Sequence, residues 1–216
     1  LPPPPLANVD YADQAQAVNT LLPIWQAWKI EGAPTTVDID LGIDGVRVTG
    51  RVPQLWPQAL RRLRTGKLKT RFRLRYWIDY LAVVAAGHDV ALEMAGFAPK
   101  KKTLEVAHYA GNIDAPAATA ALAELIAVYR AGQRRPLPYH PDLDDEYDPD
   151  QNKAFDNVSY RFKPDAYFPH HLMRDPYFLR LLGDDDAPLG ESAEQSPFIQ
   201  AIETISGPMN AALTTV

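Results

Sequence analysis

Residues 37–52 constrain the fold of this chain more than any other segment. Apolar residues alternate with polar or small ones on both sides of Asp44-Gly45, a dipeptide that favours a two-residue type I′ hairpin turn. A loop of two residues sets the register of the strands that it joins. The expected pairs are Ile43 with Val46, Leu41 with Val48, and Val37 with Val52, with Asp38 opposite Arg51 on the other face. The segment therefore predicts an antiparallel hairpin with one apolar face.

The remaining segments alternate between helix and hairpin patterns. Apolar residues at helical spacing predict three helices, and Pro23 is expected to kink or split the first of them. Gly87 is expected to cap the second helix. The predicted helices cover residues 10–30, 72–86 and 114–132, and a second hairpin covers residues 90–94 and 104–108. This order fits one mixed sheet flanked by helices, so the predicted fold class is α/β.

Pro-rich and acidic stretches divide the chain further. Residues 1–9 open with Leu-Pro-Pro-Pro-Pro-Leu, and this run of prolines predicts a Pro-rich linker. The same residues lack the basic and apolar regions of a signal peptide. The first residue is Leu, so we expect a C-terminal piece of a longer protein. Residues 10–216 are predicted to form a single domain. Within it we expect an acidic loop over residues 134–150 and a helical tail over residues 151–216, with helices at 173–182 and 197–206.

Composition excludes several classes of function. The chain has no Cys, which excludes disulfides, thiolate nucleophiles, iron–sulfur clusters and Cys-ligated zinc. A net charge of −5 argues against a nucleic-acid polycation, and no apolar run approaches the roughly 20 residues of a membrane span. The sequence has neither a P-loop for ATP nor a Gly-x-Ser-x-Gly nucleophile motif, and its five His lack metal-ligand spacing. We expect a cytoplasmic protein that makes no contact with membranes.

Three blocks of sequence together resemble one known family. They are residues 37–53 (VDIDLGIDGVRVTGRVP), 71–81 (RFRLRYWIDYL) and 125–139 (LIAVYRAGQRRPLPY). Their order and spacing are similar to the C-terminal domain of the gamma subunit (RecC) family of exodeoxyribonuclease V, the RecBCD helicase–nuclease. The resemblance covers most of the chain. It implies a restriction-endonuclease-like fold, that of the PD-(D/E)XK nucleases, in a form that has lost its active site.

The sequence shows whether the active-site residues of such a nuclease are present. Nucleases of this fold hold Mg²⁺ between an Asp at a strand end and an acid-x-Lys triplet on the next strand. Where active relatives have Gly-x-x-Asp, this chain has Gly50-Arg51-Val52-Pro53, and none of its Lys residues has an acid two positions before it. An intact site of the common pattern is therefore excluded, and we predict no catalytic or metal-binding residue. An active metal-dependent nuclease with a rearranged site, for example one using residues 151–153, is kept as an alternative.

A basic stretch over residues 61–75 is the strongest functional candidate. It has eight positive charges and no acid, and Thr65-Gly66 predicts a turn inside it. Contact with DNA phosphates and pairing with the acidic loops are equally compatible with such a stretch. The candidate contacts to the DNA backbone are Arg61, Arg62, Arg64, Lys67, Lys69, Arg71, Arg73 and Arg75.

The connection of the second hairpin is a second candidate. An exposed Phe97 beside Lys100, Lys101 and Lys102 would suit a wedge at a strand fork, because an aromatic tip can cap the last base pair while cations hold the phosphates. The alternative is an ordinary hairpin loop in which Phe97 folds into the core.

The resemblance implies a role for the domain. It implies a non-catalytic scaffold and DNA-handling domain that guides or splits duplex DNA and contacts the motor subunits in double-strand-break repair. The expected partners are double-stranded and forked DNA and the RecB and RecD subunits. No cofactor is expected in this domain, while the parent complex uses ATP and Mg²⁺. A pure protein-interaction domain without DNA contact is the other alternative.

Overall fold

The hairpin forms as predicted in a computed structural model of the chain. Strands β1 (Thr35–Ile43) and β2 (Val46–Leu55) are antiparallel, and all four expected residue pairs are present. The two loop residues, Asp44 and Gly45, have φ values of 47° and 71°. A type I′ turn requires positive φ at both positions, which Asp tolerates and Gly adopts freely.

The structure describes residues 6–30, 32–98, 105–145 and 195–216, together with residues 147, 156, 158 and 192. It contains two compact units. One consists of Leu1–Leu122 with Ala211–Val216, and the other of Ala123–Asn210. The single domain expected over residues 10–216 stays a prediction.

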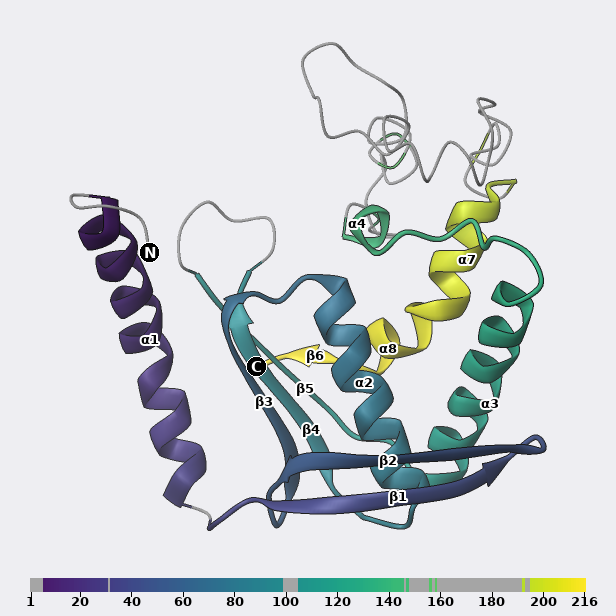
Figure 1. Ribbon diagram of the computed structural model, residues 1–216, viewed down its shortest axis with the longest axis horizontal. Helices are drawn as coiled ribbons and strands as arrows, with labels where there is room; N and C mark the ends of the chain where they lie inside the picture. The colour runs from purple at the N-terminus through teal and green to yellow at the C-terminus, as the bar shows by residue number, and fades with distance from the viewer. Residues whose placement is uncertain are drawn as a thin grey trace. The chain divides into compact units, whose positions relative to one another are not determined.

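The first unit contains a six-stranded sheet in the order β1-β2-β3-β4-β5-β6 (Figure 1). The neighbours β3 and β4 run parallel, whereas the other neighbouring pairs are antiparallel. The predicted α/β class with a mixed sheet is therefore confirmed. The strands after the first hairpin are β3 (Ala59–Lys67), β4 (Ala91–Phe97), β5 (Val106–Gly111) and β6 (Thr214–Thr215).

Strand β3 was not predicted, and the turn expected at Thr65-Gly66 is wrong, because both residues lie inside this strand. Arg61 and Arg62 make the segment look like solvent-exposed surface in the sequence. In the structure both are buried beside partners that are distant in the chain. The short strand β6 was also missed, since it is defined by its pairing with β5 rather than by an apolar pattern.

Two long helices pack on either side of β3 and β4 (Figure 1). Helix α1 (Leu6–Ile30) begins four residues before the predicted start, so residues 6–9, which were expected to belong to a linker, are helical. Pro23 lies inside α1 without breaking it. Its position is exposed, so water can bind the carbonyl that loses its helical donor. The described part of the chain contains no helix long and apolar enough to cross a bilayer.

Helix α2 (Thr70–Ala85) provides much of the core of the first unit. Its Trp77, Tyr80 and Leu81 are buried, and Gly87 ends the helical segment with a φ of +93°, as predicted. The Tyr80 hydroxyl accepts a hydrogen bond from the Ile113 backbone N–H at 3.0 Å. Burial is the main reason that the pKa of Tyr80 is raised. Helix α2 is thereby tied to the segment that follows β5.

Helix α3 (Ala115–Gly132) begins where predicted and continues into the second unit. The Asp114 carboxylate accepts a hydrogen bond from the Ala117 backbone N–H at 2.8 Å, so Asp114 caps the helix. The last helices are α7 (Pro197–Ile205), which confirms a prediction, and α8 (Gly207–Ala212), which had no sequence signal.

The predicted acidic loop contains a short helix, α4 (Pro141–Asp144), in the second unit. Asp144 is buried there and accepts hydrogen bonds from the hydroxyl groups of Tyr139, at 3.0 Å, and of Ser206. The hydroxyl of Tyr147 donates to Glu203 at 2.7 Å, and burial together with this carboxylate raises the pKa of Tyr147 to about 12. Part of the acidic loop is therefore structural. The helix expected at residues 173–182 lies outside the described residues.

Candidate nucleic-acid interface

The eight predicted DNA-contacting cations fall into two groups. Arg61 and Arg62 lie in β3 with only 4% and 5% of their surface exposed. The other six lie at the end of β3, at the start of α2 or between the two, and none of them is buried. The expectation that Arg61 and Arg62 contact DNA is therefore corrected, because their side chains are inside the protein.

Arg61 lies between two tryptophans and pairs with the neighbouring strand. Its Nε donates to Glu93 Oε2 at 3.1 Å, and Glu93 is its direct partner in β4. Its guanidinium carbon lies 5.6 Å from the Trp28 ring centroid and 5.5 Å from that of Trp56. The indole faces and the carboxylate together compensate the cost of burying this charge.

Arg62 points toward α2 instead. Its Nη2 donates to Asp79 Oδ2 at 3.1 Å, its Nη1 donates to the Pro53 carbonyl oxygen at 2.8 Å, and its guanidinium carbon lies 5.9 Å from the Tyr76 ring centroid. These partners link β3 to β2 and α2. For these two arginines the acidic partners are Glu93 and Asp79 rather than the acidic loop, which was one of the two alternatives.

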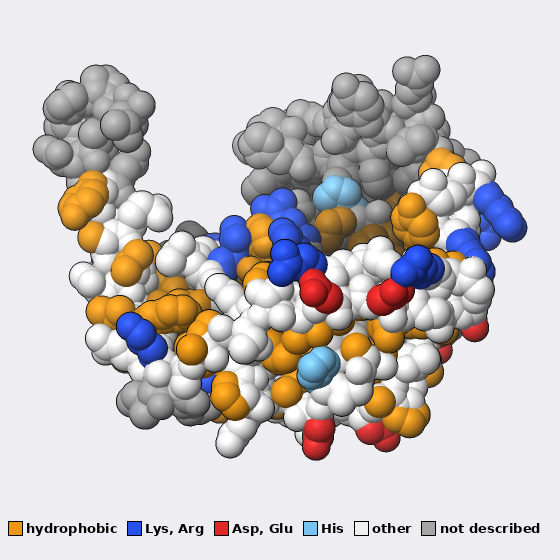
Figure 2. Space-filling view, turned by 60° about the horizontal axis from the view of Figure 1, so that its bottom comes forward, with side chains coloured by type: hydrophobic (Ala, Val, Ile, Leu, Met, Phe, Trp, Pro, Cys, Tyr) orange, Lys and Arg blue, Asp and Glu red, His pale blue; other side chains and the backbone are white. Residues whose placement is uncertain are grey.

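The remaining six cations form what we call the basic cluster. No acidic residue occurs between residues 64 and 75, so the segment has a single sign of charge. Figure 2 shows Lys and Arg side chains gathered on part of one face, with acidic side chains beside them. The basic cluster consists of Arg64, Lys67, Lys69, Arg71, Arg73 and Arg75.

The start of α2 is an unfavourable place for these charges. Lys69 occupies the N-cap position without a side-chain capping hydrogen bond, and the first turn contains no acid. A helix N-terminus carries a partial positive charge that favours anions and repels cations. The basic cluster therefore opposes the stability of α2, which is typical of residues kept for function rather than for folding.

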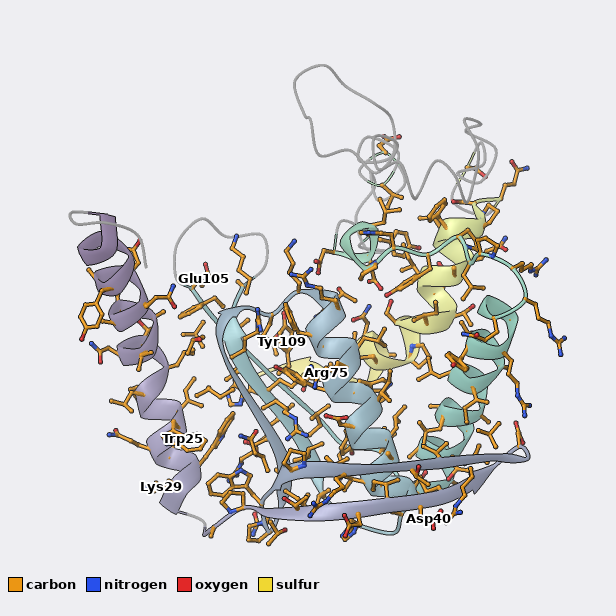
Figure 3. The ribbon with its side chains drawn as sticks, in the orientation of Figure 1. Trp25, Lys29, Asp40, Arg75, Glu105 and Tyr109 are labelled. Carbon is orange, nitrogen blue, oxygen red and sulfur yellow. The ribbon has the colours of Figure 1, made fainter. Side chains whose placement is uncertain are left out.

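Aromatic rings hold three arginines of the basic cluster. The guanidinium carbons of Arg64 and Arg71 lie 3.4 Å and 4.8 Å from the centroid of Phe72. Arg73 donates to the Thr70 hydroxyl at 2.8 Å, and its guanidinium carbon lies 5.4 Å from the Tyr109 ring centroid. Figure 3 labels Arg75 on α2 and Tyr109 on β5.

The wedge predicted at the second hairpin is corrected in part. Strand β4 extends to Phe97, whose side chain is 2% exposed and packs in a core cluster with Ala17 and Leu21 of α1. Phe97 thus stabilises the contact between α1 and the sheet and has no exposed tip for a base pair. The other wedge candidates, Lys100, Lys101 and Lys102, lie outside the described residues.

Residues 50–53, where the resemblance would place the metal site of a nuclease, lie in β2 and do not fit Mg²⁺. Residues 50–53 have no carboxylate, and β3, the next strand, has none either. Arg51 pairs with Asp38 at 2.8 Å. Arg47 pairs with Asp40 at 2.7 Å and lowers the pKa of that carboxyl below its usual value. Among the residues that the structure describes, no three His, Asp or Glu side chains form a group able to hold a metal ion.

Comparison with known proteins shows to which family this chain is related. The family model of the RecC C-terminal domain matches residues 1–146 of this chain. The chain belongs to the RecC C-terminal domain family. The RecBCD enzyme subunit RecC of Mycolicibacterium smegmatis is 36% identical over 109 residues, which cover 50% of this chain and 10% of that protein. This RecC C-terminal domain thus spans about a tenth of the relative that it matches.

The basic cluster and strands β1 to β5 of this RecC C-terminal domain lie within the matched residues. Sequence reasoning missed Phe72 as the ring that holds two arginines, although its place between Arg71 and Arg73 was a visible signal. It also missed Asp79 and Glu93, which are 17 and 32 residues from their arginine partners. No local pattern reveals pairs at such distances.

Proposed function

We propose that this RecC C-terminal domain is a non-catalytic scaffold that holds DNA through its phosphate backbone. The observation that carries the proposal is the basic cluster, six cations around an uncapped helix N-terminus without an acid among them. Each phosphate that such a cation neutralises releases counterions, so the affinity is independent of base sequence and falls with salt. Arg64 and Arg71, which stack on Phe72, keep N–H groups for phosphate oxygens.

The proposed mechanism is passive. The domain guides a duplex or a fork, while the RecB and RecD motor subunits of a cytoplasmic RecBCD-type complex supply the work with ATP and Mg²⁺. Its α/β sheet is proposed to be a PD-(D/E)XK nuclease-like fold without the metal-binding carboxylates, as the sequence of β2 and β3 supports. In this proposal the role belongs to DNA repair and recombination.

Replacing Arg71 with Glu tests the proposal, because stability and binding are expected to change in opposite directions. A carboxylate in the first turn of α2 interacts favourably with the helix dipole and with Arg75 four residues later, so the free energy of unfolding should rise by about 0.5–1 kcal/mol. Binding to a forked duplex should weaken about tenfold, because one phosphate contact is replaced by a repulsion. Urea unfolding and fluorescence anisotropy measure the two effects.

Arg75→Glu is the matched control on the same helix. Residue 75 lies beyond the first turn, so this change should weaken DNA binding without the gain in stability. If Arg71→Glu leaves DNA affinity unchanged at low salt, the basic cluster does not bind the DNA backbone.

A further inference from the structure

Arg64 and Arg71 approach the same aromatic ring from different elements. Arg64 comes from β3 and Arg71 from the first turn of α2, and both guanidinium groups lie over Phe72. Two like charges held on one small ring repel each other unless an anion lies beside them. The arrangement is therefore most favourable when a negatively charged group is bound.

The backbone explains why Arg64 reaches the ring. The register between β3 and β4 shifts between Leu63 and Lys67. An advance of four residues along β3 corresponds there to an advance of two residues along β4. Such a bulge turns side chains away from the regular alternation of a strand and is common next to functional sites. Arg64 is the first residue within this bulge.

Glycine and backbone contacts hold the bulge in place. A Cβ atom at Gly96 of β4 would lie 3.1 Å from the carbonyl oxygens of both Arg64 and Gly66, and 2.7 Å from Leu68 Cγ. The bulge therefore packs directly on a residue without a side chain. Arg64 Nε also donates to the Lys67 carbonyl oxygen at 3.1 Å. The Arg64 guanidinium is thus positioned before any ligand arrives.

We propose that Arg64 and Arg71 form a clamp for phosphodiester groups of DNA, and that Phe72 is the residue that positions both guanidinium groups. This proposal rests on the proposed function. A guanidinium that stacks on a ring has a fixed plane and keeps donors at its edge, which suits paired N–H contacts with phosphate oxygens. Because the ring orders both side chains in advance, DNA binding loses less conformational entropy.

The test compares Phe72→Leu with Phe72→Tyr in the 216-residue chain. Leucine keeps an apolar side chain but removes the aromatic face, so binding of a fluorescein-labelled forked duplex should weaken about five- to tenfold. Tyrosine keeps the face, so its affinity should stay within about twofold of the unchanged protein. Thermal unfolding of each variant shows that the fold is retained.

A double-mutant cycle separates positioning from a structural role. In an Arg64→Ala background, Phe72→Leu should cause a smaller loss of affinity than it causes alone, because one of the two side chains that it positions is already absent. The same loss in both backgrounds, or an equal loss for the Leu and Tyr variants, overturns the clamp.

The failure of the clamp and the failure of the proposed function are distinguishable. If Phe72→Leu binds like the unchanged protein while Arg71→Glu weakens binding, the clamp is overturned and the proposed function stands. If neither change affects binding to the forked duplex, both are overturned.

Discussion

Neutralising four exposed or half-exposed cations of the basic cluster is expected to weaken binding to a forked duplex about a hundredfold at ~0.1 M salt. The negative slope of the logarithm of affinity against the logarithm of salt concentration should also become shallower by up to about 3.6, since each of the four lost phosphate contacts removes roughly 0.9. Anisotropy titrations at several salt concentrations measure both quantities. The four changes are Lys67→Gln, Lys69→Gln, Arg71→Gln and Arg75→Gln.

The control removes the same number of charges from elsewhere. The cations changed in the control are exposed and lie outside the basic cluster. If DNA binding depends on where the cations lie, the control protein should keep its salt slope. Its affinity should fall only a few-fold, through the change in net charge. Equal losses for the two proteins would mean that the basic cluster is not a binding site. The control changes are Lys29→Gln, Arg47→Gln, Arg51→Gln and Arg130→Gln.

The largest expected effect on stability comes from Arg61. Its loss would leave the Glu93 carboxylate, which is 23% exposed, without its main partner, and would open a space between Trp28 and Trp56. Breaking a buried ion pair in this way costs about 3–5 kcal/mol. Arg61→Ala is therefore expected to lower the free energy of unfolding by that amount in a urea titration.

Two further variants are compared with Arg61→Ala: one removes both charges of the buried pair, and the other breaks an exposed ion pair. Arg61→Met combined with Glu93→Met removes both charges and keeps most of the volume, so it should recover at least half of the lost stability. Arg47→Ala breaks an ion pair whose partners are 76% and 59% exposed, and it should change stability little. A fully stable Arg61→Ala protein would contradict the structural role of this residue.

The sequence predicted those parts of the fold whose causes are local. The hairpin at residues 35–55 follows from alternation and an Asp-Gly turn, and both are visible within twenty residues. The start of α3 near residue 114 and the end of α2 near Gly87 were predicted for the same reason. Local steric and hydrogen-bonding rules were sufficient at these places.

The parts of the fold that were not predicted from the sequence depend on contacts between residues far apart in the chain. Strand β3 has arginines at positions that a local pattern assigns to the surface, and their burial is possible only because Glu93 and Asp79 come from β4 and α2. Phe97 is similar, because its partners Ala17 and Leu21 are about eighty residues earlier in the chain. In the candidate site, Arg61 and Arg62 serve the core, and contact of the other six cations with DNA stays a prediction.

The most direct test of the account is a salt titration of the unmodified 216-residue chain with a labelled forked duplex, followed by addition of Mg²⁺ and measurement of the DNA length. We expect binding with a slope between about −3 and −5 and DNA of unchanged length. Binding that is absent at low salt, or DNA that is shortened by the purified protein, would contradict it.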